Sequence, residues 1–281
     1  MAAILDRIVA AARARVAEAK RTTDLRELER RAERHEPRGF RRALENSHVS
    51  QQRRDMGHPT IAVIAELKKA SPSKGLIRAS FDPVGLAREL EAAGAAALSV
   101  LTDEEFFQGS LGNLREASAA VAIPCLRKDF IVDEFQLGEA RANSADAVLL
   151  IVAALSQAEL GSLARSARER GLDVLCEVHD ADELKRALDA GCDLIGVNTR
   201  DLRTFEVSLD RAFEVADRFP KNVVRVAESG IRSSEDVARL RAAGYNAFLI
   251  GESLMRAASP GDALRSLLTV SSAEYRVPSG T

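Results

Sequence analysis

The sequence predicts an α/β protein: a (β/α)8 TIM barrel that follows an N-terminal helical extension. Eight short apolar runs recur after Thr60 at intervals of roughly 26 residues, enough for a strand, two loops and a helix. An amphipathic segment with an acidic start and an Arg-rich body follows each run. Because the runs are too apolar to leave one face in water, we expect parallel strands that are covered on both faces.

The strands and helix ends follow in order along the chain. Strands are expected at residues 61–66, 96–101, 124–128, 147–152, 173–178, 194–198, 223–228 and 247–251. Polar residues at the starts of helices include Asp82 before Pro83, Ser156 with Glu159, and Ser233 with Asp236. Glycines are expected to end four helices: Gly94, Gly171, Gly191 and Gly244. Eight such units close into a barrel of typically about 250 residues. The alternative, a doubly wound open sheet, would need a GxGxxG motif after the first strand, and none is present.

Three segments divide the chain. Residues 1–58 are helical by pattern and end in a polar stretch, so we expect an extension packed on the barrel with its tail near the mouth. Residues 59–270 form the barrel, and residues 271–281 are expected to be a flexible tail. A charged appendage in solvent is the alternative interpretation of the extension.

The composition narrows the class of protein. The chain has 281 residues, 46% of them hydrophobic and 29% charged, which is typical of a folded globular protein. Forty Lys and Arg against 42 Asp and Glu give a net charge of -2, which argues against nucleic acid as a partner. Apolar runs are too short to span a membrane and the N-terminus lacks an apolar signal region, so we expect a cytoplasmic protein. The three Cys and four His lack the spacing of a disulfide framework or a metal site, so no metal is expected.

Polar residues stand at the carboxyl ends of the predicted strands, where barrel enzymes carry their chemistry. They are Glu66, Lys68, Lys128, Glu177, Asn198 and Glu228. Side chains alternate along a strand, so Glu66 and Lys68 share one face and Leu67 takes the other. A single such residue is typical of a rim salt bridge. Together they predict a catalytic site, because burying them costs several kcal/mol each unless they pair or react.

A phosphate site is indicated after the seventh and eighth strands, where barrels commonly hold this group. Small residues there offer free backbone N–H groups. The loop after the first strand adds hydroxyl groups and a lysine. The predicted substrate- and phosphate-binding residues are Ser71, Lys74, Arg200, Ser229, Gly230, Gly251 and Glu252. The side chain of Glu252 should point away from a dianion, so that only its backbone N–H serves.

Apolar residues near the same end predict a pocket for a flat, apolar part of the substrate. Only 4% of the chain is aromatic, so a cluster of phenylalanines there is informative. Ordinary anchoring of loops is the alternative. The predicted aryl pocket consists of Pro72, Phe107, Phe130, Leu149, Leu202 and Leu249.

The motifs at these strand ends resemble those of the indole-3-glycerol phosphate synthase family of tryptophan biosynthesis. In order they are AELKKASPSKG at 65–75, LTD at 101–103, FQGS at 107–110, LRKDF at 126–130, EVH at 177–179, GVN at 196–198, RDL at 200–202, AESGI at 227–231 and IG at 250–251. The resemblance runs from the extension through the last helix. Thr199 stands where the family commonly has Asn, and Glu252 stands where some members have Ser.

The resemblance implies a reaction and a role for each group. The family converts 1-(2-carboxyphenylamino)-1-deoxyribulose 5-phosphate to indole-3-glycerol phosphate, CO2 and water. It implies Lys128 as the general acid at the ketone, Lys68 paired with Glu66 at the benzoate, and Glu177 as the base. Asn198 and Glu228 would bind substrate hydroxyl groups or the anilino nitrogen. It also implies that the extension covers the mouth with Phe40 as an anchor, that no cofactor is needed, and that other enzymes of the tryptophan pathway are partners.

Three other functions remain open at this point. A related phosphate-binding isomerase would need a Cys and an Asp at the ends of strands one and six, where this chain has Glu66, Lys68 and Asn198. A Schiff-base aldolase would use a lysine as nucleophile. A sensor that binds a phosphorylated ligand without catalysis is the alternative of a different class, and the presence of both Lys128 and Glu177 argues against it.

Overall fold

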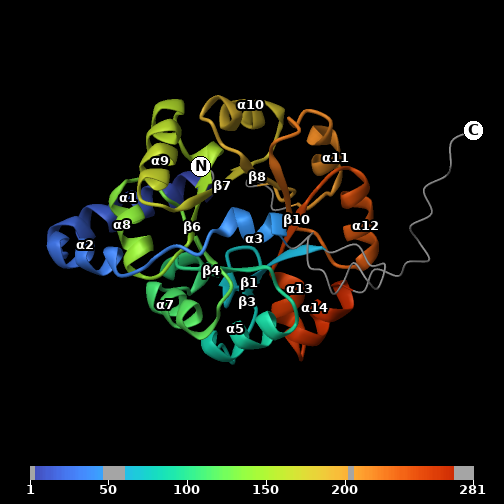
Figure 1. Ribbon diagram of the computed structural model, residues 1–281, viewed down its shortest axis with the longest axis horizontal. Coiled ribbons are helices and arrows are strands. Elements are labelled where there is room, and N and C mark those ends of the chain that lie inside the picture. Colours follow the sequence, from blue (N-terminus) through green and yellow to red (C-terminus); the bar gives the residue numbers. More distant parts are fainter. Residues whose placement is uncertain (1–3, 47–60, 202–205, 269–281) are drawn as a thin grey trace, which may run out of the picture.

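The computed structural model describes residues 4–46, 61–201 and 206–268, and within them eight parallel strands close into a barrel (Figure 1). The strands are β1 (Ala62–Leu67), β4 (Ala97–Leu101), β5 (Cys125–Lys128), β6 (Ala147–Ile151), β7 (Asp173–Val178), β8 (Leu194–Asn198), β9 (Val224–Glu228) and β10 (Ala247–Ile250). Neighbouring strands pair in chain order, and β1 pairs with β10, so the barrel sheet has no free edge. The predicted fold class is confirmed, and each predicted strand end falls within about one residue of the observed one.

A ring of helices covers the outside of the barrel. They are α5 (Pro83–Ala92), α7 (Leu111–Ala120), α8 (Phe135–Ala142), α9 (Gln157–Glu169), α10 (Ala181–Asp189), α11 (Asp210–Ala216), α12 (Ser234–Ala242) and α14 (Pro260–Leu268). The predicted caps are confirmed: Asp82 accepts a hydrogen bond from the Val84 N–H, and Ser156 and Ser233 form capping boxes. The four predicted helix-ending glycines all have positive φ, from 73° to 99°. Local side-chain and backbone chemistry therefore sets where these helices begin and end.

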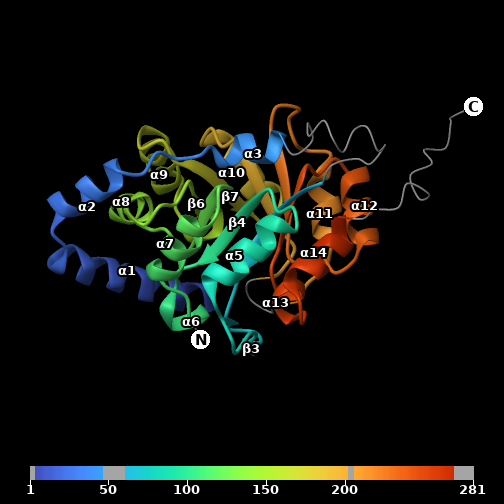
Figure 2. The ribbon, with the colours of Figure 1, turned by 60° about the horizontal axis from the view of Figure 1, so that its bottom comes forward.

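Short elements that the sequence pattern did not predict stand in the loops after the strands. They are the antiparallel hairpin of β2 (Ala70–Ser71) and β3 (Gly75–Leu76), the helices α6 (Glu104–Phe107) and α13 (Glu252–Arg256), and the 3-10 turn η1 (Val152–Ala154). Figure 2 places β3 and α6 at the same end of the barrel. We call this end, where the strands finish, the mouth, and the end where the strands begin the closed end.

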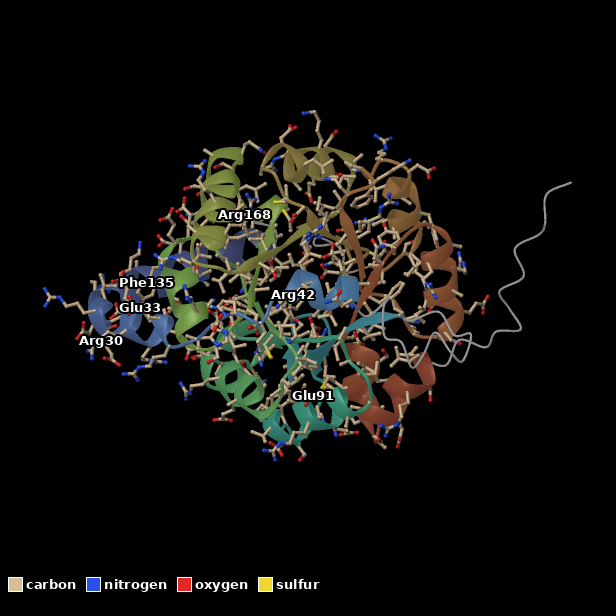
Figure 3. The ribbon with its side chains drawn as sticks, viewed as in Figure 1. Arg30, Glu33, Arg42, Glu91, Phe135 and Arg168 are labelled. Atoms are coloured by element: carbon tan, nitrogen blue, oxygen red, sulfur yellow. The ribbon has the colours of Figure 1, made fainter. Side chains whose placement is uncertain are left out.

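The N-terminal extension runs from one end of the barrel to the other. It consists of α1 (Ile4–Thr22), α2 (Leu25–Glu33) and α3 (Phe40–Asn46). Figure 2 shows α1 on the side of the mouth and α3 on the opposite side. Between them, Leu28 of α2 packs with Phe135 of α8 in one apolar cluster. The polar residues Arg30 and Glu33 of α2 are exposed at the outer edge of the molecule (Figure 3).

Phe40 lies at the closed end, so the expectation that it anchors the extension at the mouth is wrong. Its side chain and that of Leu44 are fully buried against an apolar floor to which Ala62 and Ala97 contribute from the starts of their strands. The small alanines leave room for the two larger side chains inside the narrow barrel. The divisions at residues 58, 59, 270 and 271 fall outside the described residues, as does the predicted tail.

Candidate active site

A cavity of about 680 Å³ opens at the mouth, and all eight barrel strands contribute to its wall. Every site residue that the sequence predicted lines this cavity, apart from Leu202, which lies outside the described residues. The structure therefore brings together groups that are up to 186 positions apart in the chain, from Glu66 to Glu252. Alternation along β1 separates Glu66 from Leu67 as expected: the former lines the cavity, and the latter packs outside the barrel.

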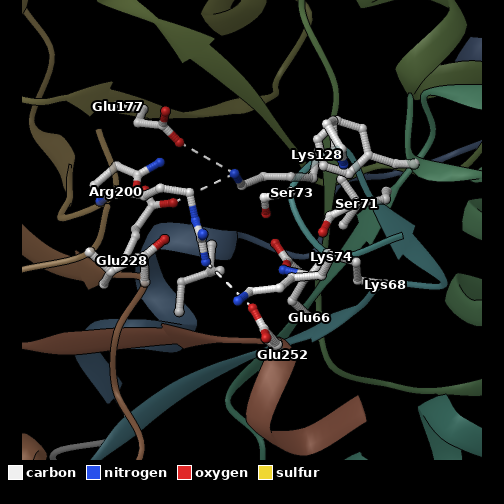
Figure 4. Close-up of a pocket in the computed structure, with 18 of the residues that line it drawn as sticks. Glu66, Lys68, Ser71, Ser73, Lys74, Lys128, Glu177, Arg200, Glu228 and Glu252 are labelled. Carbon is white, nitrogen blue, oxygen red and sulfur yellow. Dashed lines mark hydrogen bonds and ion pairs between the residues drawn. The ribbon is translucent and has the colours of Figure 1, made fainter. Parts of the chain in front are cut away.

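Lys128 is the centre of the charged wall (Figure 4). Its Nζ lies 3.3 Å from Oε2 of Glu177 and 3.6 Å from Oε2 of Glu228. Burial works to lower the pKa of Lys128, but attraction to Glu177, Glu228 and Glu66 outweighs it, and the pKa is raised. Lys128 is therefore an ammonium group at neutral pH, able to donate a proton but not to attack as a free amine.

A second ion pair stands beside the first. Nζ of Lys68 donates a hydrogen bond of 2.6 Å to Oε1 of Glu66. Burial opposes ionisation of Glu66, but the charges of Lys68 and Lys128 lower its pKa. A side chain at Gly251 would collide with this carboxylate, so the glycine that directly follows the neighbouring strand β10 leaves the space that Glu66 occupies. The pair gives the cavity a cation whose position is fixed.

Glu177 lies between Lys128 and His179. On one side is Lys128, and on the other Nε2 of His179 lies 3.5 Å from Oε1 of Glu177. Burial opposes ionisation, but Lys128 and His179 lower the pKa of Glu177. His179 is oriented by Glu183, which accepts from its backbone N–H at 2.8 Å and lies 3.0 Å from Nδ1. Glu177 is therefore an ionised carboxylate, the form that accepts protons.

Glu228 differs from the other two carboxylates. Burial raises its pKa and Lys128 lowers it, but the nearby charges of Glu177 and Glu66 leave it at about 8. Neither carboxylate oxygen accepts a hydrogen bond from the described residues. A side chain at Gly196 of β8 would collide with this carboxylate, so Gly196 leaves the space for it. A buried carboxyl without hydrogen bonds is available to a ligand.

The loops after β8, β9 and β10 form the cationic end of the cavity. Ser229 and Gly230 have consecutive positive φ values of 69° and 76°, which turns the chain sharply after β9. A Cβ at position 230 would lie 2.7 Å from Val207, so only glycine fits there. The hydroxyl of Thr199, at one of the two positions that depart from the family pattern, donates a hydrogen bond of 3.0 Å to the Ser229 carbonyl.

Glu252 faces into this end, so the expectation that its side chain points away is wrong. Its Oε2 lies 3.4 Å from Nη2 of Arg200 (Figure 4). Its Oε1 lies 3.1 Å from Nε of Arg256. The guanidinium group of Arg200 draws the carboxylate inward, which a prediction based on a bound dianion alone did not consider. Arg232 and Arg256 line the same cavity and were not predicted.

The apolar part of the wall joins predicted and unpredicted residues. The rings of Phe107 and Phe130 have centroids 6.3 Å apart and an interplanar angle of 37°. Ile4, Leu5 and Ile8 of α1 complete this side of the cavity. These three residues were not predicted from the sequence. Their spacing indicated only a helical apolar face, with no sign of which part of the barrel it would cover.

Arg15 connects α1 to the loops that carry the aromatic residues. Its Nη2 lies 2.7 Å from Oδ2 of Asp103 and 3.7 Å from Oδ1 of Asp129. Asp103, whose side chain is fully buried, caps α6 by accepting from the Phe106 N–H, and Asp129 accepts from the Phe130 N–H. Burial raises the pKa of Asp103 despite these bonds. Arg15 therefore holds α1 against both loops.

The closed barrel and the polar groups at its strand ends together define a (β/α)8-barrel enzyme with an acid–base site. A model of the family described as indole-3-glycerol phosphate synthase matches residues 5–267. The chain belongs to this family. No helix in the described parts of the chain is long and apolar enough to cross a membrane.

Individual relatives agree with the family match. The chain is 59% identical over 268 residues to indole-3-glycerol phosphate synthase of Koribacter versatilis, covering 95% of this chain and 100% of that protein. It is 50% identical over 264 residues to the enzyme of the same name from Burkholderia ambifaria, covering 94% and 98%. Among solved structures, a mandelate oxidase (TM-score 0.57, 21% identity, 75% of this chain and 72% of that one) shares the barrel fold. So does KGPDC from Streptococcus mutans (TM-score 0.57, 12% identity, 74% and 95%).

Proposed function

We infer that this protein closes the indole ring of tryptophan biosynthesis as a decarboxylating carbon–carbon lyase. It converts 1-(2-carboxyphenylamino)-1-deoxyribulose 5-phosphate to indole-3-glycerol phosphate, CO2 and water. The observation that carries the chemistry is the ammonium group of Lys128, which lies between Glu177 and Glu228 in a cavity with an aromatic wall and a cationic end. Membership of the family over residues 5–267 supports the choice of substrate.

Ring closure needs a proton donor at the ketone. An aryl carbon attacks the carbonyl carbon, and the carbonyl oxygen becomes a hydroxyl group as it takes a proton. Lys128 is proposed as that general acid. Lys68, held by Glu66, binds the benzoate carboxylate and orients the ring for attack. The carboxylate then leaves as CO2, and its bonding electrons return to the ring system.

Loss of water completes the indole. One proton must be removed from the ring intermediate, and the departing hydroxyl must be protonated. Glu177 is the proposed base because Lys128 and His179 lower its pKa and so favour the ionised carboxylate, and Lys68 is the proposed acid for the hydroxyl. Asn198 and Glu228 are proposed to bind substrate hydroxyl groups or the anilino nitrogen. No electron is gained or lost overall, so the residues need no redox carrier.

In this proposal, the cationic end, the apolar wall and α1 bind and enclose the parts of the substrate that do not react. The substrate phosphate binds at the cationic end, where Ser71, Lys74 and Arg200 join the backbone N–H groups of residues 229, 230 and 251. The aryl ring lies against Pro72, Phe107, Phe130, Leu149 and Leu249, with α1 as a cover that excludes water from the developing charge. Of the extension, residues 1–58, α1 is thus proposed to act as part of the site, while α3 packs at the closed end.

The setting of the reaction follows from the substrate. We expect the enzyme to act in the cytoplasm, where a phosphorylated substrate is retained because a dianion does not cross an apolar bilayer. Contacts with other enzymes of the tryptophan pathway are proposed from family resemblance alone. Nucleic acid is not expected as a partner, given the net charge of -2.

One assay tests the reaction directly. The purified protein is incubated with the synthetic substrate, and formation of the indole ring is followed by absorbance or fluorescence. Turnover that stops in Lys128→Ala supports the proposal, and no indole formation by the folded wild-type protein overturns it. Borohydride added with substrate checks the aldolase alternative, because it traps a Schiff base. The raised pKa of Lys128 already disfavours that route, since its amine is not free to attack.

A further inference from the structure

The contact between Glu252 and Arg200 has no part in the reaction described above. Arg200 follows β8, and Glu252 begins α13 directly after β10. Their side chains meet inside the cavity at 3.4 Å and are 20% and 28% exposed, so the pair is largely shielded from solvent. An ion pair in such a place is weakened less by salt than one on the surface.

Glu252 has a second cationic partner on its own helix. Its other carboxylate oxygen, Oε1, lies 3.1 Å from Nε of Arg256, one turn further along α13. Arg256 is more exposed, at 48%. The carboxylate therefore bridges an arginine inside the cavity and an arginine near its rim. The two contacts use different carboxylate oxygens.

The same position is where the substrate phosphate is proposed to bind. Arg200, Ser229, Gly230 and Gly251 line this end of the cavity together with Glu252. A phosphate dianion bound to Arg200 would meet a carboxylate that holds the same guanidinium group. The Glu252 carboxylate and the phosphate would therefore compete for the guanidinium group of Arg200. The two anions repel each other most strongly when both lie close to it.

We propose that Glu252 competes with the substrate phosphate for Arg200 and releases it by turning to Arg256. Glu252 thus sets how tightly the cavity holds a phosphate dianion. Substrate and product both carry the phosphate, so the competition weakens both alike, and it acts on binding and product release rather than on ring closure. This inference rests on the proposed function, specifically on the placing of the phosphate at Arg200.

The first experiment measures inhibition of indole formation by inorganic phosphate in Glu252→Gln. The amide removes the negative charge while keeping the size of the side chain, so the inhibition constant of phosphate should fall about 3- to 10-fold, and KM should fall with it. An unchanged or higher inhibition constant overturns the proposal. If Glu252→Gln does not fold, Glu252→Asp, which is one methylene shorter and reaches Arg200 less well, takes its place with the same expected direction.

Two further variants separate contact from general charge. Glu235→Gln removes a charge from the first turn of α12, where Glu235 is exposed and does not line the cavity. It should leave the inhibition constant within about 2-fold of wild type, and a decrease equal to that of Glu252→Gln would overturn direct competition. Arg256→Gln removes the outer partner, so Glu252 should stay on Arg200 and phosphate should bind more weakly. Tighter binding there contradicts release toward Arg256.

Arg200→Gln distinguishes failure of this inference from failure of the phosphate site. If phosphate inhibits Arg200→Gln as well as wild type, the phosphate does not use Arg200, and that part of the proposed function fails along with the competition. If phosphate inhibition is lost in Arg200→Gln but is unaltered in Glu252→Gln, the phosphate site stands and only the role of Glu252 fails.

Discussion

The two ends of the barrel are covered by the same N-terminal extension, and each is joined to it through an arginine that pairs with a buried aspartate. At the closed end, Nη2 of Arg38 lies 2.6 Å from Oδ2 of Asp146. Asp146 also accepts from the Cys125 N–H at 2.6 Å and the Arg38 N–H at 2.7 Å. Burial opposes ionisation of Asp146, but the hydrogen bonds from His35 and Arg38 lower its pKa. Every polar side-chain atom of Arg38 and Asp146 therefore has a hydrogen-bond partner.

At the mouth, several buried polar atoms lack a hydrogen-bond partner among the described residues. Nη1 of Arg15 is buried without a hydrogen-bond partner among the described residues, and so are Nε2 of His179 and both oxygens of Glu228. A protein built only for stability leaves few such groups. The contrast fits a closed end whose Arg38–Asp146 pair stabilises the fold and a mouth whose polar groups are open to a ligand.

The largest effect expected from this contrast is on catalysis. Lys128→Ala and Glu177→Gln should each lower kcat by about 100- to 10,000-fold, the usual contribution of a general acid or base. KM should change far less, because both groups act on charge that develops along the reaction path. Steady-state kinetics of indole formation measures both constants. Wild-type kcat in either variant would contradict the assigned role.

At the closed end the expected effect is on stability. Phe40→Ala should lower the free energy of unfolding by about 3–5 kcal/mol, because it leaves a cavity inside a fully packed floor. Urea denaturation measures this loss. Leu25→Ala is the control: Leu25 is 53% exposed on the neighbouring helix, so its loss should be small. If the fraction of Phe40→Ala that remains folded has a strongly altered KM, the separation between the two ends fails.

Arg15 tests whether the extension acts at the mouth. Arg15→Met should raise KM about 3- to 10-fold at temperatures where the variant is folded, because α1 then loses its hold on the loops of Phe107 and Phe130. Arg13→Met is the matched control, since Arg13 lies on the same helix but pairs with the exposed Glu159. Deleting residues 1–40 instead would be ambiguous, because it also removes Phe40 from the closed end.

An equal rise of KM in Arg13→Met and Arg15→Met would show only that α1 had been loosened in general. A lowered melting temperature with unchanged KM in Arg15→Met would assign the extension a purely structural role.

The sequence predicted the barrel and many of the residues that line its cavity, because both depend on local signals. Alternation along a strand places Glu66 in the cavity and Leu67 outside it, whatever the rest of the chain does. No local signal predicts which end of the barrel each helix of the extension covers. α1 and α3 both have an apolar face, and periodicity does not indicate which end of the barrel that face meets. Phe40 was misplaced for this reason.

The contact between Glu252 and Arg200 was also beyond prediction. These residues are 52 positions apart, and they meet only because β9 and β10 follow β8 around the closed sheet. The expected direction of Glu252 considered repulsion from a phosphate and left out the two arginines. Pairing between side chains on different loops depends on the final geometry, which no local pattern contains.

The smallest effect expected is a pH dependence of stability from Glu228. Its pKa is about 8 in the folded protein against an ordinary 4.5, so the folded state holds this proton more tightly than the unfolded state does. The resulting stabilisation is complete below about pH 4.5 and is lost as the pH rises through about 8. Glu228→Gln cannot lose a proton, so its melting temperature should exceed that of wild type at pH 9, and the gain should shrink toward pH 5. Thermal melts of both proteins across this range measure the difference. A gain in melting temperature that is the same at every pH would point to better packing of the amide. It would contradict the claim that ionisation of Glu228 destabilises the mouth at high pH.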